Sequence, residues 1–162
     1  MKRHETPHEI AVALARHAPK TIRALLDPAV GTGNLIEPLL SRLRRNESQV
    51  YCIDSDPEAI QHVEQTLRGV LPPSAYLIQA DFLEWSSRCV TTRFDCVVMN
   101  PPFAGKKANW YPMETEGAGG VRILRHAPLE AAFVRRAIEL LVDGGRLLAV
   151  LPSSIVMSDS LQ

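Results

Sequence analysis

The sequence lacks the features that mark membrane proteins, disulfide-bonded secreted proteins and strongly charged nucleic-acid binders. No apolar run approaches the length of a membrane span, and the first residues lead into no signal-type apolar region, so we expect a cytoplasmic protein with no membrane partner. The three cysteines have no CxxC spacing and are expected to be reduced. The 18 basic residues balance the 18 acidic ones, so any contact with nucleic acid must be local.

Three common kinds of binding site are also missing. The five histidines form no cluster with ligand spacing, so we expect no metal. No GxxxxGKS or GxxxxGKT run is present, which excludes a P-loop. A pattern of the GxGxxG type begins at Gly31, but its third glycine falls on Ile36, a bulky β-branched residue that departs from the dinucleotide-binding fingerprint.

What the sequence does contain is an alternation of helix-like and strand-like segments. Its 162 residues are 46% hydrophobic and 22% charged, which fits one globular domain over residues 1–162. We expect strands over 22–27, 50–54, 75–78, 96–99 and 146–151. We expect helices over 7–18, 34–45, from Pro57 onward and over 129–142, the last ending at the turn signal Asp143-Gly144-Gly145. This order predicts an α/β fold with a Rossmann-like, doubly wound, mostly parallel sheet.

The strand over 96–99 ends abruptly at Asn100-Pro101-Pro102-Phe103. The prolines stiffen the loop, and the first one biases Asn100 toward an extended backbone. The Asn100 amide oxygen and the Pro101 carbonyl would then be fixed acceptors for an NH2 group, with Phe103 stacked on the ring that carries it. A strand-ending turn with a buried phenylalanine explains these four residues about equally well.

A second candidate site is the glycine-bearing stretch between the first strand and the helix that follows it. Gly31 and Gly33 allow a tight turn and a close approach of a nucleotide-like cofactor at the carboxyl end of the strand. Asp54 closes the second strand, where its carboxylate is placed to accept hydrogen bonds from ribose hydroxyls. Its neighbour Asp56 is explained as a helix cap.

These motifs together resemble the S-adenosylmethionine-dependent methyltransferases of the Rossmann-like class I fold. More narrowly, they resemble the N6-adenine DNA methyltransferases of restriction-modification systems. The resemblance rests on Asp27-Pro28-Ala29-Val30-Gly31-Thr32-Gly33, Asp54, Asp81-Phe82 and Asn100-Pro101-Pro102-Phe103, in this order.

The resemblance implies a role for each motif. Asp27, Ala29, Gly31 and Gly33 would hold the methionine and ribose portion of S-adenosylmethionine, and Asp54 its ribose. Asp81 and Phe82 would border the cofactor's adenine. Asn100, Pro101, Pro102 and Phe103 would form the catalytic motif that receives the target base.

The N-terminal segment 1–20 resembles the family's cofactor motif that precedes the glycine loop. Thr6 and Pro7 stand at the start of its expected helix, where exposed N–H groups could bind the cofactor's methionine carboxylate. A capping box formed by Thr6 and Glu9 accounts for the same residues.

The motif order resembles the gamma arrangement, in which target recognition follows catalysis. The segment between Asp81 and Asn100 is too short for a recognition domain, and the chain ends at Gln162, soon after its last expected strand. We therefore expect a C-terminally truncated fold, completed by a missing region or by a separate recognition subunit. We also expect a flexible active-site loop over 104–128 that contacts DNA, although a plain surface loop fits that stretch as well.

The function expected from this resemblance is methyl transfer to the N6 amine of adenine in DNA, on a base turned out of the duplex. Enzymes that methylate RNA bases or the side-chain amide of a protein glutamine share the motif architecture and stay open as alternatives. A noncatalytic module that binds the cofactor or a partner is a third possibility.

Overall fold

The computed structural model describes residues 5–88, 91–103, 110–116 and 122–153. Five strands form its main sheet in the order β3-β2-β1-β4-β7, and every neighbouring pair is parallel. The strands are β1 (Ala24–Asp27), β2 (Gln49–Asp54), β3 (Ala75–Gln79), β4 (Phe94–Met99) and β7 (Leu141–Ala149). The predicted doubly wound parallel sheet is confirmed.

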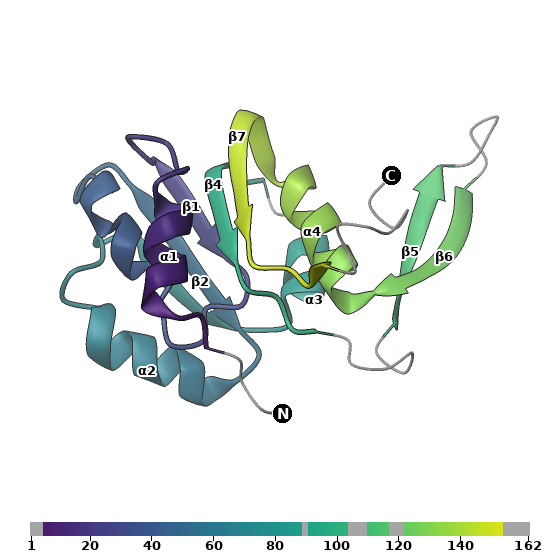
Figure 1. Cartoon of the computed structure of the whole chain (residues 1–162), viewed down its shortest axis with the longest axis horizontal. Helices are drawn as coiled ribbons and strands as arrows, with labels where there is room; N and C mark the ends of the chain where they lie inside the picture. The colour runs from purple at the N-terminus through teal and green to yellow at the C-terminus, as the bar shows by residue number, and fades with distance from the viewer. Residues whose placement is uncertain (1–4, 89–90, 104–109, 117–121, 154–162) are drawn as a thin grey trace.

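Helices cover both faces of this sheet (Figure 1). One face packs against α1 (His8–Ala15), the 3-10 helix η1 (Glu37–Arg42) and α2 (Pro57–Leu67), and the other against α3 (Phe82–Ser87) and α4 (Leu129–Glu139). Alternate β1 residues serve the two faces, since Leu25 lies in the core under α1 and Leu26 lies in the core under α4. The carboxyl ends of β1 and β4 point to the lower edge of the molecule in Figure 1.

Residues 34–45 do not form the α-helix expected after the glycine loop. They pass through turns into η1, which has Pro38 in its first turn. Proline has no N–H, and its ring excludes the carbonyl four residues earlier, at Asn34, from an α-helical hydrogen bond. The prediction of an α-helix over 34–45 is wrong because Pro38 interrupts the α-helical hydrogen bonding at this point.

The boundary between α4 and β7 also differs from expectation. The helix ends at Glu139 and the strand begins at Leu141, so the glycines expected to end the helix lie inside the strand. Gly144 has a φ of 77°, and the pairing of β7 with β4 shifts register between Phe94 and Cys96. Gly144 therefore lies in an irregularity of the strand rather than at a helix end.

Part of the stretch 104–128 is regular, which corrects the expectation of a loop throughout. β5 (Trp110–Glu116) and β6 (Arg122–Pro128) pair in antiparallel fashion and extend to the right of α4 in Figure 1. Aromatic and β-branched residues in both segments favour strands. The glycines at 117, 119 and 120, which suggested a loop, follow β5 and lie outside the described residues, as do residues 104–109.

Two of the three predicted reduced cysteines, Cys52 and Cys96, are buried in the core as free thiols. Cys89 lies outside the described residues. Within the described ranges, the structure has no helix that is long and apolar enough to cross a membrane.

Candidate active site

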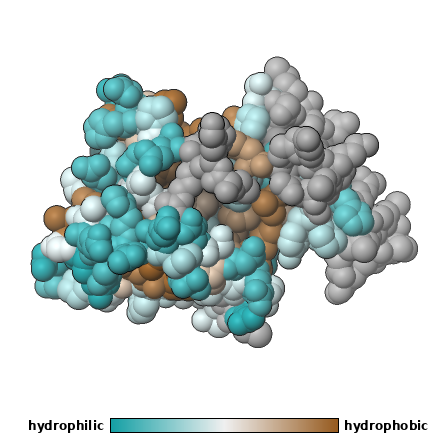
Figure 2. All heavy atoms as spheres, turned by 90° about the horizontal axis from the view of Figure 1, so that it is seen from below, coloured by the Kyte–Doolittle hydropathy of each residue, from teal (hydrophilic) through white to brown (hydrophobic). Residues whose placement is uncertain are grey.

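The predicted site residues that follow β1, β2 and β4 come together where the sheet reverses its strand order. β1 pairs with β2 on one side and with β4 on the other, and both pairs are parallel, so the residues that follow β1, β2 and β4 emerge at the same edge. In doubly wound sheets this reversal opens a crevice at the carboxyl ends of the strands. Figure 2 looks onto this edge from below and shows apolar surface beside a strongly polar region.

The glycine loop after β1 is held to the end of β2 by its own backbone. Val30 N–H donates to the Ile53 carbonyl at 2.9 Å, and Gly31 N–H donates to Asp54 Oδ2 at 2.9 Å. Gly31 has a φ of 53° and Gly33 a φ of 83°, which are left-handed conformations that favour glycine. The turn therefore depends on both glycines.

The two glycines differ in what surrounds them. A Cβ on Gly33 would lie 2.6 Å from Leu67 Cδ1, whereas a Cβ on Gly31 would meet nothing within 4 Å. Gly33 therefore allows α2 to pack closely against the loop. Gly31 borders open space, which is available to a ligand.

A matched pair of alanine substitutions tests this difference. We expect Gly31→Ala to lower the free energy of unfolding by about 1 kcal/mol, from backbone strain alone. Gly33→Ala adds a contact with the end of the Leu67 side chain, which must shift to make room, and is expected to cost about 1–2 kcal/mol. Urea denaturation of both variants measures the difference, and equal losses would show that Leu67 yields without cost.

Asp54 lies at the end of β2, as predicted, and its carboxylate accepts two backbone hydrogen bonds. Oδ2 accepts from Gly31 and Oδ1 accepts from Asp56 N–H at 2.9 Å. Each carboxylate oxygen has a second lone pair, so the group can still accept hydrogen bonds from the hydroxyls of a ligand. Asp56 caps α2 through Glu58 N–H at 2.9 Å, which confirms its expected role.

Asp27 ends β1 beneath the glycine loop and is completely buried. Its Oδ1 accepts from Ala29 N–H at 3.1 Å, but its Oδ2 has no hydrogen-bond partner among the described residues. Burial raises the pKa of this carboxyl from 3.8 to about 8; the Ala29 hydrogen bond opposes that rise and the charge of Asp54 adds to it. Asp27 is therefore a buried acid that would gain from a nearby cation.

The raised pKa of Asp27 predicts a pH dependence of stability. The folded protein keeps the Asp27 proton up to about pH 8, whereas the unfolded chain loses it near pH 4, so stability falls as the pH rises between these values. In Asp27→Asn this contribution is absent, and the variant should gain in melting temperature relative to wild type from pH 5 to pH 8. Thermal melts across that range test this, and parallel profiles for the two proteins would contradict it.

Thr6 lies at the same edge and joins two loops that are distant in sequence. Its hydroxyl accepts a hydrogen bond from Asn100 Nδ2 at 3.0 Å, and its carbonyl accepts one from Asn34 Nδ2 at 3.0 Å. The side chain is 5% exposed. The expected capping box does not form, since α1 has no side-chain cap and Pro7 occupies the N-cap position. The hydroxyl that was expected to cap the helix contacts Asn100 instead.

Asn100 to Phe103 follow β4 as predicted. Pro101 is buried, while Asn100, Pro102 and Phe103 are half-buried. The Asn100 Oδ1 atom is itself buried. Val150 N–H donates to the Met99 carbonyl at 2.9 Å and fixes the end of the strand against β7. The loop thus leaves the sheet from a rigid base.

Asp81 and Phe82 begin α3 beyond the end of β3. Asp81 is exposed and caps the helix, because its Oδ1 accepts from Glu84 N–H at 2.9 Å. The Phe82 ring is 1% exposed and packs against Trp85 and Phe133, with ring centroids 6.4 Å and 5.0 Å away. Phe82 as a whole belongs to the core, so at this edge the structure exposes Asp81 and not Phe82.

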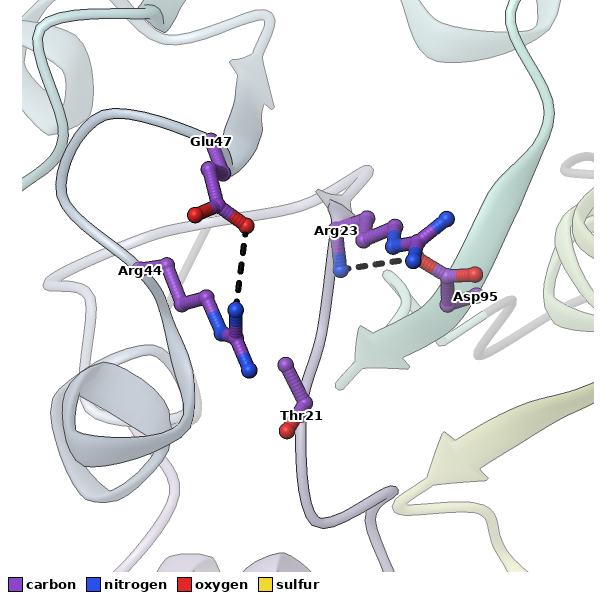
Figure 3. A pocket seen from close by; sticks show the side chains of 5 residues that line it. All are labelled: Thr21, Arg23, Arg44, Glu47 and Asp95. Atoms are coloured by element: carbon purple, nitrogen blue, oxygen red, sulfur yellow. Dashed lines mark hydrogen bonds and ion pairs between the residues drawn. The ribbon is translucent and has the colours of Figure 1, made fainter.

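A separate cavity of about 400 Å³ lies at the opposite edge of the sheet, near the amino ends of β1 and β4 (Figure 3). It is lined by Thr21, Arg23, Arg44, Glu47 and Asp95. Asp95 Oδ2 accepts from the backbone N–H groups of Arg23 and Ala24, both at 2.8 Å, and so ties β1 to β4. No predicted site residue lines this cavity.

Sequence reasoning missed Asn34, which the structure places in the site. It follows Gly33 directly, so its place in the glycine loop was the one sequence feature that pointed to it. Its contact with Thr6, however, spans 28 residues.

No group of His, Cys, Asp or Glu side chains that could hold a metal ion occurs among the described residues.

Comparisons with known proteins find similar sequences and folds among methyltransferases. A family model described as a methyltransferase domain matches residues 25–110. The type II methyltransferase M.BsuBI of Bacillus subtilis is 23% identical over 146 residues, which cover 80% of this chain and 28% of that protein. The chain thus spans less than a third of the length of this curated relative.

Two solved structures show the same fold. The methyltransferase subunit of a type I restriction-modification system from Streptococcus thermophilus superposes with a TM-score of 0.70 at 19% identity, over 97% of this chain and 36% of that chain. A Streptococcus mutans protein solved in complex with SAH has a TM-score of 0.57 at 16% identity, over 90% of this chain and 72% of that chain. The five-stranded parallel sheet with flanking helices is the Rossmann-like fold of class I methyltransferases.

Proposed function

Because the chain belongs to the methyltransferase domain family, we propose that it transfers a methyl group from S-adenosylmethionine to the N6 amine of adenine in DNA. One observation supports an amine as the group that accepts the methyl. Asn100 is held at the end of β4 with its amide nitrogen donating to Thr6, so its oxygen is the amide atom that can bind an N–H group. The curated relative is named as a type II methyltransferase and one structural neighbour as a restriction-modification subunit, which favours DNA.

S-adenosylmethionine is the cofactor that the family and the fold indicate, and the residues at the carboxyl edge fit it. The open space beside Gly31 admits a ligand close to the backbone. The Asp54 carboxylate can accept hydrogen bonds from the ribose hydroxyls. Asp27 Oδ2, buried and lacking a partner among the described residues, suits a cofactor that carries positive charge.

The chain's own residues would prepare the amine for transfer. When bound, S-adenosylmethionine supplies an electrophilic methyl group on a sulfonium. The Asn100 amide oxygen and the Pro101 carbonyl would accept the two hydrogens of the target amine, which orients its nitrogen and favours a tetrahedral geometry there. Phe103, half-buried, would stack on the base. Catalysis would then come from position and from fixed acceptors.

DNA contacts and the choice of target sequence belong to the proposal as well. The target adenine would be turned out of the duplex to reach Asn100. The segment 104–128, with the hairpin β5–β6, follows the Asn100 loop directly and would contact the DNA around the base. We propose that a further region or a recognition subunit selects the sequence.

The class of substrate can be tested by offering S-adenosylmethionine with a labelled methyl group to DNA, RNA and protein in separate reactions. The proposal predicts label in DNA. Label in RNA or in protein glutamine would support the alternative activities. Cofactor binding without transfer to any of the three would support a noncatalytic module.

A further inference from the structure

The hydrogen bond between Thr6 and Asn100 joins two segments that are far apart in the sequence. Thr6 comes from the segment before α1 and Asn100 from the loop after β4, 94 residues apart. Thr6 is 5% exposed and Asn100 is half-buried, so the hydrogen bond is partly shielded from water.

The Thr6 main chain is fixed independently of this contact. Asn34 Nδ2, from the glycine loop, donates to the Thr6 carbonyl at 3.0 Å. The next residue, Pro7, accepts through its carbonyl from Ile10 and Ala11 N–H at 3.1 Å, and so begins α1. The Thr6 hydroxyl is therefore presented to Asn100 from a rigid support.

The orientation of the Asn100 amide matters for the proposed chemistry. The last torsion of an asparagine side chain is broad and roughly two-fold, so an unrestrained amide presents either its oxygen or its nitrogen to a ligand. An amide nitrogen facing the target amine would place two donors against each other. In the structure Asn100 Nδ2 donates to Thr6 Oγ1, so the oxygen is the amide atom that can accept a hydrogen bond from a ligand. Because a hydroxyl can donate as well as accept, this contact fixes where the amide lies rather than which of its atoms faces the ligand.

We infer that Thr6 is a positioning residue: its hydroxyl holds the Asn100 side chain in the place where the target amine would meet it. This inference rests on the proposed function, because it assigns Thr6 to the same transfer step. It also gives the Thr6 hydroxyl a role distinct from binding the cofactor. The hydroxyl acts on Asn100, and the cofactor-binding loop is linked to Thr6 through Asn34.

Thr6→Val tests the inference, because valine has nearly the same shape and lacks the hydroxyl. We expect kcat for adenine methylation to fall about tenfold to a hundredfold, since the acceptor loses its fixed geometry. The dissociation constant of S-adenosylmethionine should stay at the wild-type value. Thr6→Ser keeps the hydroxyl and is expected to remain within about threefold of wild-type kcat. Thr66→Val is the matched control, because the Thr66 hydroxyl donates to the His62 carbonyl on the exposed surface of α2.

A spectroscopic readout makes the test independent of turnover. In the protein without cofactor, the Asn100 side-chain NH2 resonances should report a hydrogen-bonded proton in wild type and Thr6→Ser, and lose that signature in Thr6→Val. If Thr6→Val keeps wild-type kcat, or loses cofactor affinity in proportion to kcat, the positioning role is wrong. If the wild-type protein labels no adenine at all, the proposed function itself fails.

Discussion

Asn100→Ala is expected to abolish methyl transfer while leaving cofactor binding almost unchanged. The substitution removes the amide oxygen proposed to accept a hydrogen of the target amine, and the loss of one fixed polar group at a reacting centre lowers kcat by about 100-fold or more. Asp27, Gly31 and Asp54, which are proposed to contact the cofactor, should keep their own hydrogen bonds, because those bonds join them to Ala29, to Asp56 and to each other. Single-turnover methylation and calorimetric titration of S-adenosylmethionine measure the two effects separately.

The control for this variant is Asn46→Ala, at an exposed position before β2. It should change neither transfer nor cofactor affinity. If Asn100→Ala lost both activities to the same degree, Asn100 would act on the cofactor or on folding, and its assignment as the group that binds the target amine would be wrong.

Asp54→Ala is expected to have its largest effect on the cofactor. Removing the carboxylate takes away the proposed acceptor for the ribose hydroxyls, and hydrogen bonds to charged groups contribute about 1.5–3 kcal/mol, so binding should weaken roughly 10- to 100-fold. The variant also frees the backbone N–H groups of Gly31 and Asp56, so a loss of stability will accompany the loss of affinity.

Asp56→Ala separates these two consequences. It removes the cap of α2 and should cost about 1 kcal/mol of stability. The dissociation constant of S-adenosylmethionine should nevertheless match that of wild type. If Asp56→Ala weakened cofactor binding as much as Asp54→Ala, the effect of Asp54 would be attributable to loop stability rather than to contact with the ribose.

The site loops could be predicted because each one follows a short buried strand. Each also contains residue types, such as glycine and proline, that favour only a few backbone conformations. Gly31 and Gly33 mark a turn with positive φ, and both have it. Asp54 stands at the end of β2, and the prolines after Asn100 stop β4. Since parallel strands end at one edge of a sheet, the order of motifs along the chain was enough to bring them together.

The features that could not be predicted depend on contacts between residues far apart in the sequence, which local sequence patterns do not reveal. Gly144 has the sequence signature of a helix end, but pairing with β4 places it inside β7. The Asn34–Thr6–Asn100 hydrogen bonds join three loops, so neither the use of the Thr6 hydroxyl nor the role of Asn34 was visible in the sequence. The burial of the Phe82 ring is likewise set by Phe133 of α4, which is distant along the chain.

The measurement that tests the central claim most directly is nucleoside mass spectrometry of DNA incubated with the full-length protein and S-adenosylmethionine carrying an isotopically labelled methyl group. The account predicts labelled N6-methyldeoxyadenosine with the wild-type protein and about 100-fold less or none with Asn100→Ala. A labelled methylcytosine, or equal labelling by the two proteins, would contradict it.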